Sequence, residues 1–182
     1  HVCEVAILGL NDYLPWQSAR VCFQNQIDFN YLEARHLVED VGIDEEGIHL
    51  AGMNYRVLII EIEPPEMIRP ALRKLEKAGR VIRWDESMGD KVLLDSLAGV
   101  IDKDLTTSAP ERDLRYRHLY KQGAHFYVLF NEGEKTIENS VDFSVKGERF
   151  ILDPKSGDMR PMRHSSLQLA PHQASVVMIR PG

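Results

Sequence analysis

The chain has 182 residues and a formal net charge of −6 at pH 7. This length accommodates one domain or two small ones, and either arrangement can bury a core. The acidic balance and the scattered Lys and Arg residues argue against a nucleic-acid partner. No apolar run approaches the ~18 residues that a membrane span requires, so we also expect no membrane partner.

Cys3 and Cys22 are the two cysteines of the chain. They form neither a disulfide framework nor a metal-binding spacing, and free cysteines are usually buried. We therefore expect two buried thiols and a cytoplasmic location, because free thiols persist in reducing compartments. The chain begins at His1 without a signal-peptide pattern, which indicates a processed piece of something longer.

The N-terminal part predicts short strands that alternate with turns and a helix. Val5–Leu10 is a short apolar run that predicts a buried strand, followed by a polar turn. Pro15 can begin a helix. The apolar face of this helix would contain Ala19, Cys22, Phe23 and Ile27. Asn30–Glu33 predicts a second strand, residues 35–40 a turn or short helix, and residues 47–55 a small hairpin.

Residues 56–86 contain the clearest pattern in the sequence, which is strand, helix, strand. Val57–Ile60 is a continuous apolar run, as in a strand that is covered on both faces. Apolar residues then recur at helical spacing from Ile68 to Leu75, with Pro70 disturbing the first turn and Gly79 ending the helix. A second strand follows at residues 81–84. This unit predicts parallel strands with a right-handed crossover.

The C-terminal part changes from helical spacing to alternation. Asp90 is predicted to cap a helix, and residues 106–112 (TTSAPER) have the composition of a linker. The apolar face of that helix would contain Leu93, Leu97, Val100 and Ile101. Leu114–Tyr120 and Ala124–Phe130 alternate around a three-residue KQG segment, which predicts a hairpin. Further short alternating runs predict an antiparallel β-sandwich. We expect an α/β domain over residues 1–105, a linker at 106–112 and an all-β domain over 113–182.

Three phrases of the all-β part resemble the C-terminal β-sandwich of large bacterial glycoside hydrolases of the α-L-rhamnosidase and β-galactosidase kind. They are RHLYKQGAHFYVLFNEG (117–133), FILDPKSGDMRPM (150–162) and LQLAPHQASVV (167–177). The opening VAILGLNDYLPW (5–16) resembles the flavodoxin-like, class I amidotransferase-like domain that some of these enzymes carry after the catalytic barrel. The resemblance implies a parallel sheet with flanking helices, followed by an antiparallel β-sandwich.

The function that this resemblance implies is non-catalytic. In such enzymes the catalytic carboxylates lie in the preceding barrel, so no catalytic residue is carried over to this chain. The implied role is support of a missing N-terminal catalytic domain of the same polypeptide, or homo-oligomerisation, with carbohydrate contact as an option and no cofactor. The alternative is a free-standing flavodoxin-like module that binds a small ligand at the edge of its sheet. That site would be lined by Asn11, Asp12, Glu33, Arg35, His36 and Asp85.

An active enzyme finds little support among the residues. Glycoside hydrolysis needs two carboxyl groups about 5–10 Å apart. The candidates at predicted strand ends are Glu33, Glu61, Glu63, Asp85 and Glu86, and solvated or capping carboxylates are the commoner reading of such residues. An amidotransferase needs a Cys on a strand-to-helix elbow, whereas Cys22 falls on the apolar face of a predicted helix.

Binding functions rest on two other sets of residues. The histidines show no metal-binding spacing, although His118 and His125 lie on adjacent predicted strands and could approach each other. The turn after the first strand supplies only Gly9 for a phosphate, so a nucleotide or flavin site is not expected. Tyr13 and Trp16, beside that turn, could instead stack on a pyranose ring.

Overall fold

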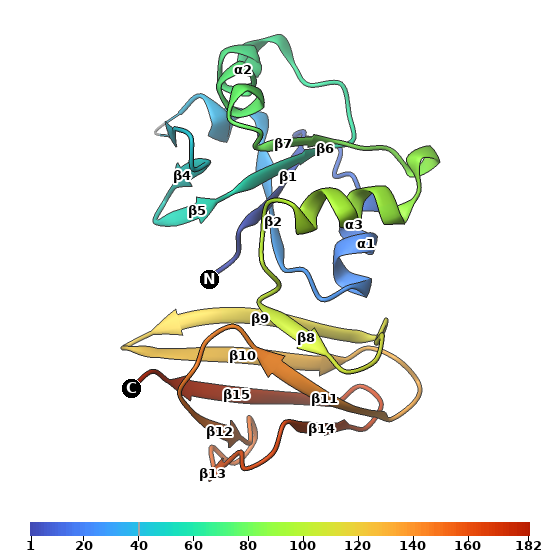
Figure 1. Ribbon diagram of the computed structural model, residues 1–182, viewed down its shortest axis with the longest axis vertical. Helices are drawn as coiled ribbons and strands as arrows, with labels where there is room; N and C mark the ends of the chain where they lie inside the picture. The colour runs from blue at the N-terminus through green and yellow to red at the C-terminus, as the bar shows by residue number, and fades with distance from the viewer. Residues whose placement is uncertain (40) are drawn as a thin grey trace. The chain divides into compact units, whose positions relative to one another are not determined.

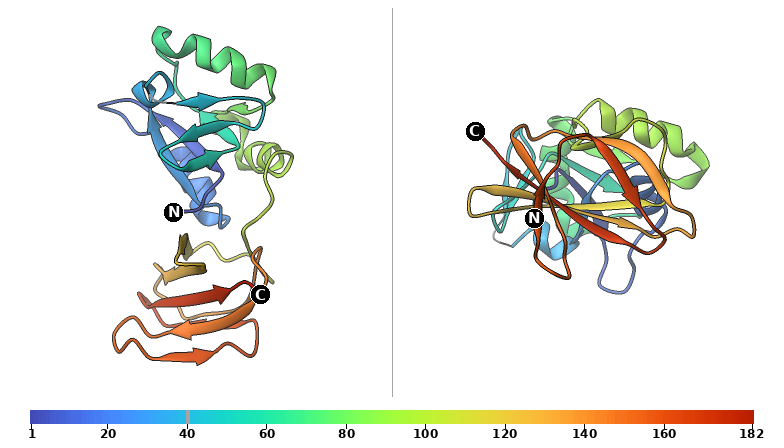
Figure 2. Two further views of the ribbon diagram at one scale, coloured as in Figure 1. Left: turned by 90° about the vertical axis from the view of Figure 1, so that its left-hand side faces the viewer. Right: turned by 90° about the horizontal axis from the view of Figure 1, so that it is seen from below.

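The computed structural model describes residues 1–39 and 41–182, and the chain divides into two compact units. The α/β unit comprises Cys3–Cys22 and Phe29–Asp102, and the sandwich unit comprises His1–Val2, Phe23–Asp28 and Lys103–Gly182. Figure 1 and Figure 2 show helices around a sheet in the first unit and strands alone in the body of the second. The prediction for residues 35–40 includes Asp40, which lies outside the described residues.

The α/β unit contains a four-stranded sheet in the order β2-β1-β6-β7. Its strands are β1 (Val5–Gly9), β2 (Phe29–Glu33), β6 (Val57–Ile60) and β7 (Val81–Arg83). All three strand pairs are parallel, which confirms the predicted parallel pair. Every residue of β1 and β6 is buried, as expected of continuous apolar runs in central strands.

Three α-helices accompany this sheet: α1 (Gln17–Gln24), α2 (Arg69–Lys77) and α3 (Asp90–Ala98). Short 3-10 turns, η1 (Ala34–Leu37), η2 (Glu66–Ile68) and η3 (Glu86–Met88), follow β2, β6 and β7. The turn η2 places Pro70 in the first turn of α2, so the predicted irregular start is confirmed. No helix within residues 1–39 and 41–182 is long and apolar enough to cross a membrane.

Three details of the predicted helices are wrong, and one is that Val100 and Ile101 lie beyond Ala98, the last residue of α3. Phe23 lies within α1 but is 37% exposed, and Ile27 lies beyond the end of α1, because the helix ends at Gln24 and residues 25–28 belong to the sandwich unit. Asp90 is the first residue of α3, and Gly89 takes the N-cap position with φ +83°. The Asp90 carboxylate instead accepts hydrogen bonds from Arg20.

A small antiparallel sheet separates β2 from β6, where a helix could have stood. It consists of β3 (Gly42–Ile43), β4 (Ile48–Leu50) and β5 (Met53–Tyr55). The β4–β5 pair confirms the predicted hairpin. Ile48 and Tyr55 pack into the same hydrophobic cluster as Leu58 and Leu72, so this sheet shares the core of the α/β unit.

The sandwich unit contains two antiparallel sheets, in the orders β13-β12-β15-β10-β9 and β14-β11-β8. Their strands are β8 (Leu105–Thr107), β9 (Leu114–Lys121), β10 (Ala124–Asn131), β11 (Ile137–Phe143), β12 (Glu148–Leu152), β13 (Met159–Pro161), β14 (Ser166–Leu169) and β15 (Ala174–Arg180). Both sheets contribute to one hydrophobic cluster, in which the rings of Tyr127 from one sheet and Phe143 from the other lie 4.5 Å apart between centroids. The fold class of an α/β part and an antiparallel β part is therefore confirmed.

Two features of the sandwich strands bear on the prediction. The β9–β10 hairpin turns at Gln122 (φ +52°) and Gly123 (φ +79°), the backbone of a type I′ turn, and it confirms the expected hairpin. Thr106 and Thr107, predicted as linker, belong to β8 and pair with β11.

Candidate functional site

The four parallel strands of the α/β unit end at one edge of their sheet, and we take this C-terminal edge as the candidate site. In open α/β sheets, ligands bind outside the carboxyl ends of the strands. The topology brings all eight predicted site residues to this edge. Asn11, Asp12, Tyr13 and Trp16 follow β1, Glu33, Arg35 and His36 end or follow β2, and Asp85 follows β7.

Most of the polar candidates make contacts within their own loops. The Arg35 guanidinium pairs with Glu33 (Nε–Oε2 2.7 Å), and the Glu33 backbone N–H donates to His36 Nδ1 (3.2 Å). Asp85 caps η3 by accepting from the Ser87 backbone N–H (2.9 Å). These contacts stabilise the turns that follow the strands.

The aromatic candidates lie at the surface of a fixed loop. Tyr13 is 45% exposed and Trp16 57% exposed. The loop is held by a backbone bridge between Leu10 and Tyr13 (N–O 2.9 Å) and by the Tyr31 hydroxyl, which donates to the Pro15 carbonyl (2.6 Å). A ligand or protein could therefore meet two aromatic rings on an ordered backbone.

Other apolar side chains join the two aromatic rings at this edge. We define the apolar edge residues as those that are exposed in the connections after β1, β2, β6 and β7. They are Tyr13, Leu14, Trp16, Val38, Met67 and Met88. Each of the four connections thus presents at least one apolar side chain to solvent. Exposed apolar residues that gather on one side of a molecule indicate an interaction surface more than scattered ones do.

Glu61, one of the carboxylates at predicted strand ends but not one of the eight predicted site residues, is partly buried at this edge. Its Oε1 accepts the Ser18 backbone N–H (2.6 Å) at the N-terminus of α1. A helix N-terminus is a favoured position for an anion because its N–H groups are unpaired and its dipole is positive there. The side chain of Glu61 already occupies this position, so a phosphate would have to displace it.

Arg20, which the sequence pattern does not single out, also lies beside this edge. Its guanidinium binds both carboxylate oxygens of Asp90 (Nη1–Oδ2 3.2 Å, Nη2–Oδ1 3.1 Å), and Glu86 Oε1 lies 3.7 Å from Nη2. The hydrogen bond to Asp90 raises the pKa of Arg20. This bidentate contact holds α1 against α3 beside the edge.

Neither cysteine has the surroundings of a nucleophile. Cys3 and Cys22 are both buried, which confirms the predicted burial of the two cysteines. Burial raises the pKa of the Cys22 thiol, and the nearby Glu61 carboxylate raises it further. Because the thiolate is the reactive form, Cys22 is poorly suited to attack a substrate.

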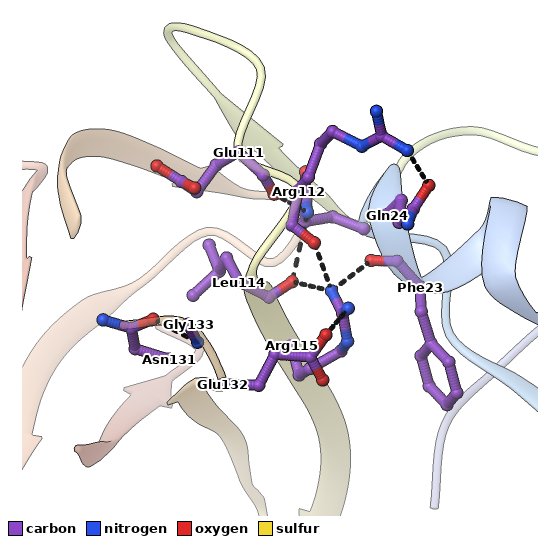
Figure 3. A network of polar contacts seen from close by, with 10 residues as sticks. Phe23, Gln24, Glu111, Arg112, Leu114, Arg115, Asn131, Glu132 and Gly133 are labelled. Carbon is purple, nitrogen blue, oxygen red and sulfur yellow. Dashed lines mark hydrogen bonds and ion pairs between the residues drawn. The ribbon is translucent and has the colours of Figure 1, made fainter. Parts of the chain in front are cut away.

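The sandwich unit contains a polar network that fastens residues 23–28 to the start of β9 (Figure 3). The Arg115 side chain donates to the carbonyls of Phe23 (3.0 Å) and Arg112 (2.7 Å), and it pairs with Glu132. Arg112 donates to the Gln24 side chain (2.5 Å). These contacts hold backbone carbonyls, so the network has the character of a structural support.

A broad groove runs along β12, β13 and β14, and none of the predicted site residues lines it. Its charged side chains balance, with three acidic and three basic residues, and no aromatic residue lines it. The six charged residues are Glu138, Asp153, Asp158, Lys155, Arg160 and Arg163. The groove therefore lacks the ring platform that sugar stacking uses and favours neither sign of charge. Among the described residues, no group of three His, Cys, Asp or Glu side chains could hold a metal ion.

The fold matches parts of known glycoside hydrolases. The rhamnosidase from Novosphingobium sp. PP1Y matches with a TM-score of 0.68 and 16% identity, over 100% of this chain and 23% of that protein. Gan42B, a GH42 beta-galactosidase from G. stearothermophilus, matches with a TM-score of 0.56 and 9% identity, over 99% of this chain and 40% of that protein. The beta-galactosidase from Bacillus circulans sp. alkalophilus matches with a TM-score of 0.53 and 9% identity, over 97% of this chain and 41% of that protein.

These similarities concern the fold alone, since the identities are low. The chain spans between 23% and 41% of the length of these three proteins. No model of a known protein family matches the sequence, and no curated protein matches it.

Proposed function

We propose that this chain is a non-catalytic part of a glycoside hydrolase, in which an α/β domain and a β-sandwich support a separate catalytic domain. One observation carries the proposal. Glycoside hydrolases share the fold of nearly the whole chain, yet the shared part is a minor share of each of them. The remaining length of those proteins has room for a catalytic domain, which agrees with the resemblance in the sequence.

The topology of the α/β unit supports the finer assignment to a flavodoxin-like, amidotransferase-like domain. Its strand order β2-β1-β6-β7 becomes 2-1-3-4 when only the parallel strands are counted. Flavodoxin-like sheets have the order 2-1-3-4-5. The buried Cys22 and the carboxylate of Glu61 at the N-terminus of α1 favour a domain that has no amidotransferase chemistry.

The apolar edge residues are the surface that we assign to the catalytic domain. They lie in four separate connections, and the loop that carries Trp16 is held by hydrogen bonds from Tyr31 and within residues 10–13. An apolar surface on a backbone held by hydrogen bonds suits a permanent contact between domains of one polypeptide, because little backbone entropy is lost on contact. Association of two copies through the same surface is the competing use.

Stabilisation in trans tests this assignment. The full-length polypeptide without these 182 residues is heated with and without added chain, and the half-life of its glycosidase activity is measured. We expect the added chain to lengthen the half-life several-fold. Trp16→Ser should abolish the effect, and Tyr120→Ser should retain it, since both side chains are 57% exposed but Tyr120 lies in the β9–β10 hairpin.

Two results would contradict the assignment. One is a half-life that does not respond to the unmodified chain. The other is equal loss with both serine variants, which would indicate general destabilisation. Sedimentation of the chain alone separates the competing use, because a dimer that Trp16→Ser dissociates would assign the edge to a second copy.

Carbohydrate contact at the same edge is a second candidate, supported by the exposed rings of Tyr13 and Trp16 beside Asn11 and Asp12. Trp84 is only 2% exposed, so a change in tryptophan fluorescence on adding a sugar would report on Trp16. Titration with rhamnose and galactose should quench or shift that fluorescence in the unmodified chain and leave Trp16→Phe unchanged. No response from the unmodified chain would exclude stacking of these sugars on Trp16.

A further inference from the structure

Two histidines contact each other inside the sandwich unit, apart from the edge described above. His118 on β9 is 2% exposed, and its Nε2 lies 2.7 Å from Nδ1 of His125 on β10. The other nitrogen of His118, Nδ1, lies 2.9 Å from Oδ2 of Asp104. The two rings and the carboxylate thus form one chain of polar contacts, and the approach of the two histidines expected from the sequence is confirmed.

The surroundings fix the chain in place. The Tyr127 hydroxyl donates to Asp104 Oδ1 (2.8 Å), and the Ser144 hydroxyl donates to the same oxygen. The Tyr127 ring stacks on His118, with 4.1 Å between centroids and 18° between planes. Neither the carboxylate nor the buried imidazole can turn away without losing these contacts.

The proton positions follow from the partners. Asp104 is a carboxylate, because the hydrogen bonds from His118, Ser144 and Tyr127 outweigh the effect of burial and lower its pKa. A carboxylate only accepts, so His118 Nδ1 carries a proton and donates it. In a neutral His118 the other nitrogen, Nε2, is then an acceptor, and His125 Nδ1 must supply the proton between the rings.

Counting protons shows what the pair tolerates. With one added proton, the two facing nitrogens still consist of one N–H and one lone pair, and the hydrogen bond survives. With two added protons, both facing nitrogens carry hydrogen and confront each other across 2.7 Å. Two donors without an acceptor lose the hydrogen bond, and two positive charges at this distance repel.

Other charged and titratable groups around the pair do not alter this count. Asp28 accepts the backbone N–H of His118 (Oδ2, 3.4 Å) and pairs with the side chains of His1 (2.7 Å) and Arg117 (3.6 Å). The ring of Tyr120 lies 4.8 Å from that of His125. Arg149 on β12 lies two strands away from His125, because both residues pair with Ile179 on β15. The Arg149 side chain forms an ion pair with Asp142.

We propose that the His118–His125 pair is a proton-responsive contact of the sandwich, which keeps the β9–β10 hairpin closed with no or one added proton and opens it on binding the second. This inference does not depend on the proposed function. The pair sits on the strands that carry one of the three phrases in which the chain resembles glycoside hydrolases, so mild acid would loosen that part first.

The direction of the pH effect follows from His125. Burial lowers the pKa of His125, the neighbouring His118 lowers it further, and Asp104 opposes both. The folded chain therefore binds fewer protons than the unfolded chain below the ordinary His pKa of about 6.5. Stability consequently falls as the pH drops from about 6.5 towards the lowered pKa of His125.

Urea unfolding at pH 7 and pH 5 tests the proposal on the full 182-residue chain. One proton that the folded state excludes raises the unfolding constant by about 25-fold over this interval. His125→Gln retains an N–H donor for His118 but cannot be protonated, so its unfolding constant should rise by a factor about 25-fold smaller than that of the unmodified chain. His164→Gln, an exposed histidine elsewhere in the sandwich unit, should behave like the unmodified chain.

Equal pH dependence in His125→Gln and the unmodified chain would overturn the proposal. If His125→Gln does not fold, nitrogen-15 NMR of the unmodified chain decides instead. We expect the Nδ1–H tautomer at His125 at pH 7 and a second protonation step that coincides with loss of the β9–β10 amide signals. Two independent titrations that leave those signals in place would contradict it.

Discussion

Single buried side chains decide how the sandwich is held together, and Asn131 is the clearest example. Its side chain is completely buried, and Nδ2 donates to the carbonyls of Lys135 (2.8 Å), Leu169 (3.1 Å) and Ala170 (3.0 Å). Its Oδ1 accepts the backbone N–H of Gly133 (3.0 Å), as Figure 3 shows. One amide thus joins the end of β10, the following turn and the end of β14.

Replacing Asn131 should therefore be costly. Asn131→Ala leaves several buried backbone groups without a partner, and we expect the free energy of unfolding to fall by about 3 kcal/mol. Gln168→Ala removes an exposed amide with one contact to Glu138, and a change within about 0.5 kcal/mol is expected. Urea denaturation of both variants checks the contrast, and similar small losses would show that the Asn131 contacts contribute little.

Residue roles at the candidate site depend on contacts that no local pattern encodes. The residue types and loops of Glu33, His36 and Asp85 follow from the sequence, because strand ends are readable from apolar runs. The contacts of Glu61 with Ser18 and of Arg20 with Asp90 join residues 43 and 70 positions apart. Spacing along the chain gives no signal for such pairs.

Elements with strong periodicity could be predicted, and elements fixed by tertiary contacts could not. Val57–Ile60, the helix α2 and the β9–β10 hairpin all have apolar patterns that agree with the local structure they form. The end of α1 is different, because the apolar Phe23 and Ile27 continue the helical spacing although the helix ends at Gln24 and residues 23–28 belong to the sandwich unit. The short strand β8 exists only through its pairing with β11.

Gly47 is the residue on which the small β3-β4-β5 sheet depends most directly. Its φ is +142°, and a Cβ at this position would lie 2.0 Å from the Tyr55 carbonyl oxygen. Gly47→Ala should therefore destabilise the chain by about 3 kcal/mol or more, since neither the backbone nor the carbonyl has room. Gly52 is the matched control, because its φ is +78° but nothing lies within 4 Å of a Cβ there.

Gly52→Ala should cost only the left-handed conformation, about 1 kcal/mol. Thermal unfolding of the two variants side by side measures the difference. Equal melting temperatures of the two variants would mean that the sheet tolerates a Cβ at position 47 despite the close approach of the Tyr55 carbonyl.

At the scale of the whole molecule, the acidity of the chain belongs to one unit. Cys3–Cys22 and Phe29–Asp102 contain 17 Asp and Glu against 10 Lys and Arg, a net −7, whereas the sandwich unit contains 11 against 12, a net +1. The apolar edge residues therefore belong to an acidic unit. A catalytic domain that binds there should present apolar side chains among neutral or basic ones.

The composition alone could not locate this asymmetry, because the chain's −6 averages over both units. The order of motifs and the change from helical spacing to alternation did predict an α/β part before a β part. The apolar surface of the first part is not readable from the sequence, because its residues come from four separate connections that only the parallel sheet brings to one edge.

Hydrolysis of a panel of aryl-glycosides, by this chain and by the full-length polypeptide, tests the central claim most directly. We predict turnover by the full-length polypeptide and none above background by the 182-residue chain, because at its sheet edge Glu33 pairs with Arg35 and Asp85 caps a turn. Turnover by the purified chain that Asp85→Asn or Glu86→Gln abolishes would contradict the claim and assign catalysis to the edge itself.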